Sequence, residues 1–184
     1  MEEEFDRTLS MELKLKSGVL RSWAAGDAKA IARYANNRKI WANLRDAFPH
    51  PYALADAEGF LNMVAQEKPE MTFAIATEAE AIGCIGLRRG VDVHRKTAEL
   101  GFWLGEPFWG GGIMTEAVRE FVRWGFEELD LNRIQAESFE GNAASARVLE
   151  KAGFVREGRM RANVLKDGKV MDSLLYARLS QPTA

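Results

Sequence analysis

The sequence has very little of the chemistry from which metal sites and disulfides are built. Among its 184 residues are one cysteine and two histidines. One cysteine cannot form an internal disulfide, and these three side chains are too few for a zinc site of cysteines and histidines. The cysteine, Cys84, lies in an apolar run, which favours a buried structural thiol over a nucleophile. We therefore expect no metal.

The sequence also lacks a surplus of positive charge and a hydrophobic run long enough to cross a membrane, which takes about 20 residues. Its formal net charge is −2, which argues against a nucleic-acid partner held by bulk positive charge. The N-terminal residues 1–4 are mostly acidic and lack the layout of a secretory signal. We expect no membrane partner, no nucleic-acid partner and a reducing, cytoplasmic location.

The length and continuity of the chain indicate a single domain. A chain of 184 residues is long enough to enclose one hydrophobic core. No internal repeat or low-complexity linker divides it. Residues 1–10 are polar and are predicted to be frayed, so the predicted domain spans residues 11–180.

Three consecutive glycines, Gly110, Gly111 and Gly112, separate an aromatic run from a helical pattern that begins near Met114. Glycine is needed where the backbone turns with positive φ or approaches a ligand closely. The free N–H groups of a first helical turn, together with the helix dipole, bind anions and most often phosphate. The triplet alone fits a flexible connection equally well. The succession of strand, glycine turn, long amphipathic helix and strand favours the phosphate site.

Hydrophobic periodicity predicts an α/β fold with one mixed, mostly antiparallel sheet and helices on both faces. A helix between two strands implies that those strands, residues 97–104 and 133–139, are parallel. Residues 36–52 are predicted to be irregular, either the border of a binding site or an apolar plug. The predicted strands are 13–20 with an interruption near Gly18, 71–76, 81–88, 97–104, 133–139, 154–165 and 170–179. The predicted helices are 27–36 with Asp27 as N-cap, 53–66, 114–129, and 142–153 with Asn142 as cap.

Two stretches resemble motifs of one enzyme family. The sequence from Trp109 to Ala117, WGGGIMTEA, resembles the W-G-x-G-x-x-T-E-A stretch of the GNAT acetyltransferase superfamily in its RimJ/RimL-like branch. Residues 142–154 resemble the N-x-x-S-x-x-x-x-x-K-x-G-F stretch of the same branch. Met114 departs from the wider superfamily, which has glycine or alanine there. The resemblance covers residues 13–179 and implies the GNAT fold, with its parallel strand pair at the cofactor cleft.

The resemblance implies transfer of an acetyl group from acetyl-CoA, as co-substrate, directly to an amine. It implies that N–H groups of residues 110–115 hold the pyrophosphate and that the strand before the loop pairs with the pantetheine arm. Asn142 would hold the pantetheine or a water, and Ser145 would donate a proton to the departing thiolate. The implied cofactor-binding residues are Phe102, Trp103, Leu104, Trp109, Gly110, Gly111, Gly112, Ile113, Met114, Thr115, Asn142 and Ser145.

The acceptor amine must lose a proton before it attacks, and Glu99 is the best candidate for the base. Two alternatives stay open: Glu99 is only a surface glutamate or an ion-pair partner of Arg95 or Lys96, or water alone supplies the base. An α-amine, with a pKa of about 7.7–8.0, is roughly one-fifth neutral near pH 7.4, whereas lysine, at about 10.4, is roughly 0.1% neutral. A chain N-terminus therefore needs a weaker base than lysine does.

The resemblance favours a protein N-terminal α-amine as acceptor. A small-molecule amine, such as a polyamine, an antibiotic or an amino acid, is the first alternative, and a non-catalytic CoA-binding module is the second. The oligomeric state stays open, a homodimer included. The residues expected to contact the acceptor are Arg45, Asp46, His50 and Tyr52.

Overall fold

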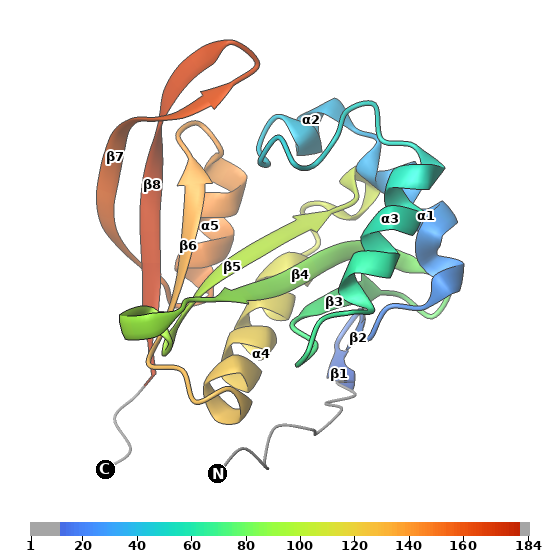
Figure 1. Cartoon of the computed structure of the whole chain (residues 1–184), viewed down its shortest axis with the longest axis horizontal. Helices are drawn as coiled ribbons and strands as arrows, with labels where there is room; N and C mark the ends of the chain where they lie inside the picture. The colour runs from blue at the N-terminus through green and yellow to red at the C-terminus, as the bar shows by residue number, and fades with distance from the viewer. Residues whose placement is uncertain (1–11, 181–184) are drawn as a thin grey trace.

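The structure, a computed structural model, describes residues 12–180, so the predicted frayed segment 1–10 lies outside the described residues. Eight strands form one sheet in the order β1-β2-β3-β4-β5-β6-β8-β7 (Figure 1). The strands are β1 (Glu12–Leu15), β2 (Gly18–Arg21), β3 (Thr72–Ala76), β4 (Ala81–Arg89), β5 (Thr97–Leu104), β6 (Arg133–Phe139), β7 (Val155–Lys166) and β8 (Lys169–Leu179). The α-helices are α1 (Ala28–Ala35), α2 (Arg38–Trp41), α3 (Leu54–Val64), α4 (Ile113–Glu128) and α5 (Ala143–Lys151).

The parallel pair β5–β6 confirms the mixed sheet that the sequence predicts, because every other neighbouring pair is antiparallel. The pairing of β5 with β6 is short. It runs only from Thr97 opposite Arg133 to Glu99 opposite Gln135. Beyond these residues each strand continues without the other, to Leu104 in β5 and to residue 139 in β6. The two strands therefore open a gap in the middle of the sheet.

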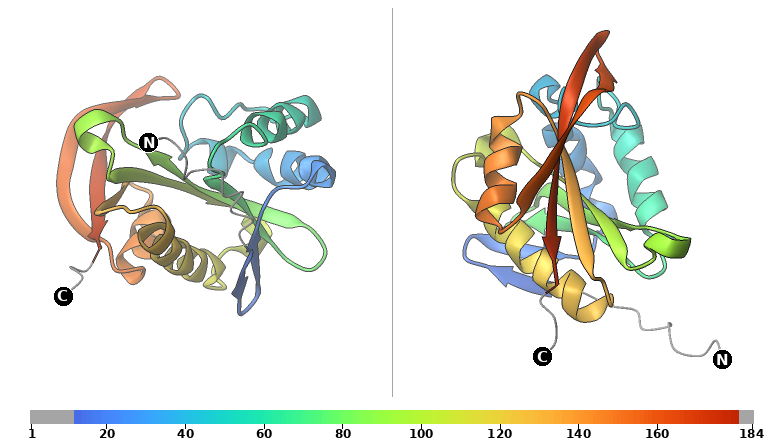
Figure 2. Two further views of the ribbon diagram at one scale, coloured as in Figure 1. Left: turned by 60° about the horizontal axis from the view of Figure 1, so that its bottom comes forward. Right: turned by 90° about the vertical axis from the view of Figure 1, so that its left-hand side faces the viewer.

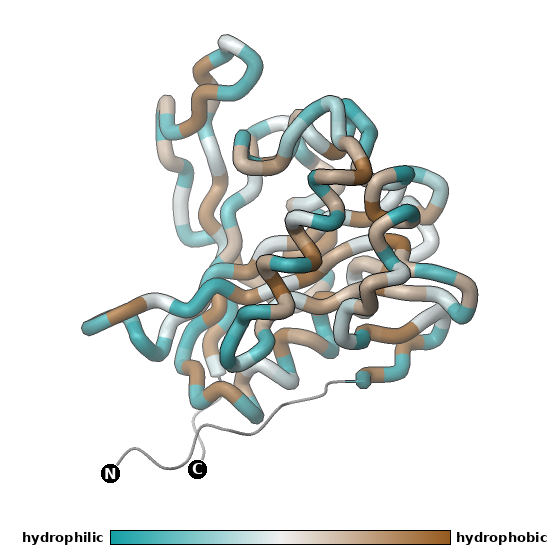
Figure 3. Tube along the Cα trace, turned by 45° about the vertical axis from the view of Figure 1, so that its right-hand side comes forward, coloured by the Kyte–Doolittle hydropathy of each residue, from teal (hydrophilic) through white to brown (hydrophobic). Residues whose placement is uncertain are grey.

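Helices cover both faces of the sheet, as expected. The views in Figure 2 place α4 and α5 on one face and α1 and α3 on the other. Hydrophobic and hydrophilic residues alternate along the strands and helices (Figure 3), as in elements that bury one face. Among the described residues, no helix combines the length and the hydropathy that a membrane span requires.

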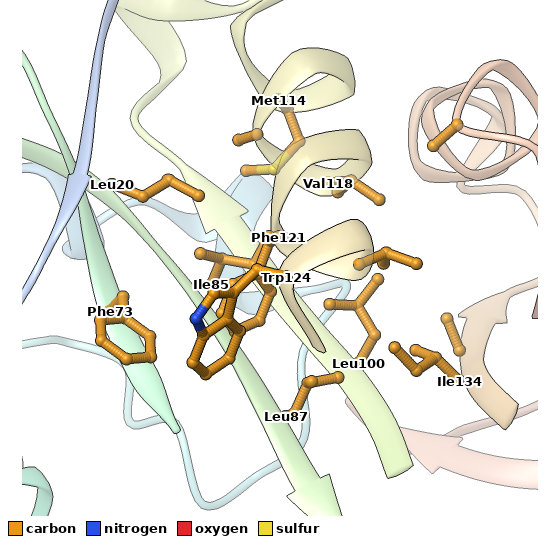
Figure 4. Packing of buried hydrophobic residues seen from close by; sticks show 14 of the residues in the cluster. Leu20, Phe73, Ile85, Leu87, Leu100, Met114, Val118, Phe121, Trp124 and Ile134 are labelled. Atoms are coloured by element: carbon orange, nitrogen blue, oxygen red, sulfur yellow. The ribbon is translucent and has the colours of Figure 1, made fainter. Parts of the chain in front are cut away.

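Helix α4 supplies much of the larger core. Phe121 and Trp124 stack at 5.3 Å between ring centroids, and Phe73 of β3 meets both edge-on (Figure 4). Burying such a side chain contributes about 1.5–3 kcal/mol. Met114, at the start of α4, is 7% exposed and belongs to the same core. The core therefore accommodates the bulk that distinguishes this residue from glycine or alanine.

Three details of the predicted elements differ from the structure. The interruption expected near Gly18 is a turn at residues 16–17, and it reverses the chain, so that residues 13–20 belong to the antiparallel pair β1–β2. The segment 36–52 contains α2, where the Asn37 side chain accepts a hydrogen bond from the Lys39 N–H at 2.8 Å. Asp27 occupies the N-cap position of α1, as predicted, but its side chain makes no cap hydrogen bond to that helix, because a 3₁₀ turn, Ala25–Asp27, precedes it. Its carboxylate instead accepts from the Ala24 N–H at 2.9 Å, which moves the cap three residues earlier.

Candidate active site

The glycine loop, residues 109–112, is tied to the end of β5. The indole Nε1 of Trp109 donates to the Leu104 carbonyl oxygen at 2.7 Å. Gly110 has φ of +81° and Gly112 has φ of +83°, conformations that L-residues other than glycine rarely adopt. These two glycines allow the chain to reverse within a few residues and to enter α4 at Ile113.

The N–H groups of residues 110–115, unpaired within the described part of the chain, indicate an anion-binding site. The first hydrogen bond into α4 runs from the Glu116 N–H to the Gly112 carbonyl at 3.1 Å. Within residues 12–180, no N–H group from Gly110 to Thr115 donates to a protein acceptor. Such groups at a helix N-terminus, next to the positive end of the helix dipole, are suited to hold a phosphate.

A cleft of about 540 Å³, here called the loop cleft, follows these N–H groups. It lies between the glycine loop and the first two turns of α5. Asn142 begins that helix and accepts a hydrogen bond from the Ser145 N–H at 3.1 Å, which confirms the predicted cap. The Ser145 hydroxyl is half-buried and has no hydrogen-bond partner among the described residues. It is therefore free to donate to a bound ligand.

A second cleft of about 1210 Å³, here called the sheet cleft, contains the gap between β5 and β6. Its walls come from α3, the segment after α2 and the end of β7. The two clefts share lining residues, so they meet at the end of β5 and the start of α5. The shared residues are Asn43, Leu44, Phe102, Trp103, Asn142 and Ser145.

Glu99 lies in the sheet cleft with both carboxylate oxygens engaged. Oε1 accepts from Nη2 of Arg45, and Oε2 accepts from Nη2 of Arg88 at 2.6 Å. The alternative partners named from the sequence lie elsewhere: Lys96 pairs with Asp130 at 2.9 Å, and Arg95 donates to a backbone carbonyl. Two guanidinium groups from different elements therefore occupy both oxygens of this carboxylate.

The model of the family described as "Acetyltransferase (GNAT) domain" matches residues 19–155. The chain belongs to the GNAT acetyltransferase family. The Bacillus subtilis protein YdaF is 38% identical over 99 residues, and the match covers 54% of each chain, so this chain spans about half the length of that relative. The ribosomal-protein-serine acetyltransferase of Escherichia coli is 31% identical over 117 residues, 64% of this chain and 65% of the relative. A solved RimL structure in complex with coenzyme A superposes with a TM-score of 0.81 at 20% identity, covering 92% of this chain and 98% of that chain.

In this GNAT domain, the residues proposed from the sequence for the cofactor gather in one place. All of them except Gly111 line the loop cleft. Sequence reasoning missed three cations in the same lining: Lys39, Arg147 and Lys151. Arg147 and Lys151 are four residues apart on α5, so helical spacing within the second motif could have found them. Lys39 comes from α2, which the sequence did not predict.

Of the four residues expected to contact the acceptor, three line the sheet cleft and one does not. Arg45, Asp46 and Tyr52 line the sheet cleft of the GNAT domain. His50 lines neither cleft. Its ring lies 5.6 Å from that of Trp41, and its buried Nδ1 has no partner among the described residues. Burial, reinforced by the charge of a nearby carboxylate, raises the pKa of Tyr52 to about 12, so its hydroxyl is neutral at physiological pH.

The tip of the β7–β8 hairpin closes one side of the sheet cleft. Lys166 is 3% exposed, and its Nζ lies 2.7 Å from Asp46 and 3.9 Å from the centroid of the Trp41 ring. Next to it, Asp167 pairs with Arg38 of α2 at 2.5 Å. These contacts join the hairpin to the segment around α2. Within residues 12–180, no group of three or more histidine, cysteine, aspartate or glutamate side chains is placed to hold a metal ion.

Proposed function

We propose that this protein is an N-acetyltransferase that moves an acetyl group from acetyl-CoA to the α-amine at the N-terminus of a protein. The observation that carries the proposal is the set of free N–H groups from Gly110 to Thr115. These groups face a cleft that meets a second cleft beside the Ser145 hydroxyl. One cleft therefore suits the nucleotide thioester, and the other suits the amine.

The loop cleft fits acetyl-CoA by its donors and its charge. The N–H groups of residues 110–115 would hold the pyrophosphate, and Arg147 and Lys151 would add positive charge along the same cleft, whereas Lys39 is already paired with Glu106. The backbone of Phe102, Trp103 and Leu104 follows the cleft from the end of β5. It would pair with the pantetheine arm and polarise the thioester carbonyl. Acetyl-CoA supplies the activated acetyl group.

The reaction releases two protons from an ammonium acceptor. The ammonium loses the first proton before it attacks, and Glu99 is the proposed acceptor, directly or through water, from which this proton passes to solvent. As the new C–N bond forms and the C–S bond breaks, Ser145 is the proposed donor of a proton to the CoA sulfur and regains one from the nitrogen. Asn142 positions Ser145 by accepting the hydrogen bond from its N–H.

The ordinary pKa values of amines favour an α-amine over lysine as the acceptor. Both oxygens of Glu99, the proposed base, already accept hydrogen bonds from Arg45 and Arg88. An α-amine is already partly neutral near pH 7.4, because its pKa of about 7.7–8.0 lies well below the value of about 10.4 for lysine. Similarity to a ribosomal-protein-serine acetyltransferase supports the same acceptor class. The free Ser145 hydroxyl argues against a CoA-binding module without activity.

The test is CoA release from acetyl-CoA with a panel of acceptors. The panel contains peptides with free N-termini, N-blocked lysine peptides, spermidine and an aminoglycoside. We expect turnover with the free N-termini, and acetylation located on the α-nitrogen by mass spectrometry. Turnover with spermidine or the aminoglycoside but not with peptides would assign the site to small amines instead. Binding of acetyl-CoA without turnover of any amine would contradict both activities.

A further inference from the structure

Two guanidinium groups meet at Glu99 in the sheet cleft, a local excess of positive charge in a lining that otherwise has more carboxylates than cations. Arg45 reaches this carboxylate from the segment after α2, and Arg88 reaches it from β4, where it lies directly opposite Glu99 in the strand register. Two guanidinium groups therefore share one carboxylate. The group of three carries a net charge of +1.

Both guanidinium groups keep most of their donors free. Each uses only Nη2 to reach Glu99, and neither makes another hydrogen bond within the described part of the chain. Their side chains are 55% and 68% exposed. Because a guanidinium has five N–H donors in a planar fork, each can still bind a further carboxylate through two parallel hydrogen bonds. The arginines are thus open toward the cleft rather than saturated within the protein.

The other charged groups of the lining are already engaged. Lys166 pairs with Asp46. The remaining carboxylates accept hydrogen bonds from neighbouring groups: Asp56 from the Ala53 N–H, Glu67 from the Met71 N–H and the Thr72 hydroxyl, and Glu137 from the Asn163 amide. Arg45 and Arg88 are therefore the cations in this lining that a ligand can reach.

We infer that Arg45 and Arg88 form a recognition site for a carboxylate carried by the acceptor. The acceptor class is then a polypeptide with aspartate or glutamate within the first few residues after its free α-amine. This inference rests on the proposed function, because it places the amine near Ser145 and the acidic side chain at the arginine pair. Exposed ion pairs contribute little stability, so the pairs with Glu99 can yield to an acceptor carboxylate at low cost.

The test compares peptides that differ only at positions 2 and 3, where glutamate, glutamine or lysine follows the same first residue. For the native protein, kcat/KM measured by CoA release should be about tenfold higher with glutamate than with glutamine, which corresponds to about 1.4 kcal/mol. Lysine should be the poorest. Arg45→Gln and Arg88→Gln should each reduce the preference, and the double variant should bring the ratio close to one. Arg88→Glu should favour lysine over glutamate.

Arg123→Gln is the matched control. Arg123 is also 55% exposed and also pairs with glutamates, but it lies on the outer face of α4 and lines neither cleft. Its substitution should keep the full preference for glutamate. Equal thermal unfolding temperatures and equal acetyl-CoA affinities of all variants would show that folding and the loop cleft are intact.

A measurement of peptide binding tests the recognition site independently of the proposed activity. The affinity of fluorescent peptides for the CoA-bound protein can be measured by anisotropy without any turnover. If no peptide is acetylated but the glutamate peptide still binds more tightly through the two arginines, the proposed function fails and the recognition site stands. A native protein that does not distinguish glutamate from glutamine in either assay would overturn the inference. So would a double variant that keeps the preference.

Discussion

The glycine loop allows a test in which two adjacent substitutions should behave differently. Gly112 has φ of +83°, whereas Gly111 lies outside the left-handed region. A Cβ built at either position meets no heavy atom within 4 Å. Crowding within the protein therefore does not distinguish Gly111→Ala from Gly112→Ala. Only the backbone conformation does.

The expected magnitudes follow from the two conformations. Alanine held in the left-handed region costs about 1–2 kcal/mol, and its smaller unfolded-state entropy offsets about 0.4–1 kcal/mol. Gly112→Ala should therefore change the unfolding free energy by about 0–1.6 kcal/mol in the destabilising direction if the loop keeps its shape, which is about 1–2 kcal/mol worse than Gly111→Ala, because both variants gain the same entropy term. If the loop instead relaxes to negative φ, the N–H groups turn away from the anion. The lost charge-assisted hydrogen bonds, at about 1.5–3 kcal/mol each, would then weaken acetyl-CoA binding by tenfold or more. Gly111→Ala should leave binding unchanged and be neutral or slightly stabilising.

Two measurements on each variant test whether the positive φ of Gly112 positions the N–H groups of the loop. Urea unfolding without ligand gives the free energy of unfolding, and isothermal titration gives the affinity for acetyl-CoA. Gly112→Ala must lose stability, affinity or both, because the conformational cost has to appear in one of them. If Gly112→Ala equals Gly111→Ala in both measurements, the positive φ of Gly112 does not position the N–H groups. The argument for the phosphate site would then lose its geometric basis.

Three further predictions concern single side chains. Ser145→Ala should lower kcat by about 10–100-fold, a larger effect than its weakening of acetyl-CoA binding, and an unchanged kcat in single-turnover assays would remove Ser145 from the reaction. Burial alone would raise the pKa of Asp27, but hydrogen bonds from Arg21 and the Ala24 N–H, together with the guanidinium charge, outweigh it and lower the pKa. The ionised Asp27 carboxylate therefore stabilises the folded protein fully above the unfolded-state pKa of about 3.9. This stabilisation is lost as the pH falls from that value through the lower pKa of the folded state. Asp27→Asn should cost about 1.5–3 kcal/mol of unfolding free energy at pH 7, with a smaller difference in urea titrations near pH 3. Burial raises the pKa of the Cys84 thiol, so a thiol reagent should modify the native protein far more slowly than the protein in urea; equal rates would contradict its burial.

The succession of elements could be predicted because each long element repeats its pattern several times. Helix α4 has 16 residues, and its apolar residues at helical spacing, Ala117, Val118, Phe121, Val122 and Trp124, are all buried. Helix α2 has only four residues, too few for a helical period to show. Its N-terminus depends on Asn37, which a sequence pattern does not distinguish from the neighbouring Asn36.

What the sequence could not predict at the candidate site are mainly contacts between side chains that lie far apart along the chain. The gathering of residues 102–104, 109–115 and 142–145 depends on two local motifs and on the order of strands, and all of these can be read along the chain. The partners of Glu99 cannot, because Arg45 lies 54 residues away and Arg88 lies opposite it in an antiparallel register. His50 was expected to contact the acceptor because its segment is rich in aromatic residues. The same aromatic character instead packs it against Trp41.

Because the two clefts share lining residues, only some variants can change the binding of one substrate without the other. Phe102, Trp103, Asn142 and Ser145 line both clefts, so their substitution should alter the KM values of both acetyl-CoA and the amine. Substitution of a residue that lines only one cleft can be assigned to the binding of one substrate. Variants of Arg88, in the sheet cleft alone, should change only acceptor parameters, and variants of the residues 110–115, in or beside the loop cleft, should change acetyl-CoA affinity first. In the proposed reaction the thioester and the amine would meet at the few side chains that line both clefts, and each substrate would be recognised by the residues of its own cleft.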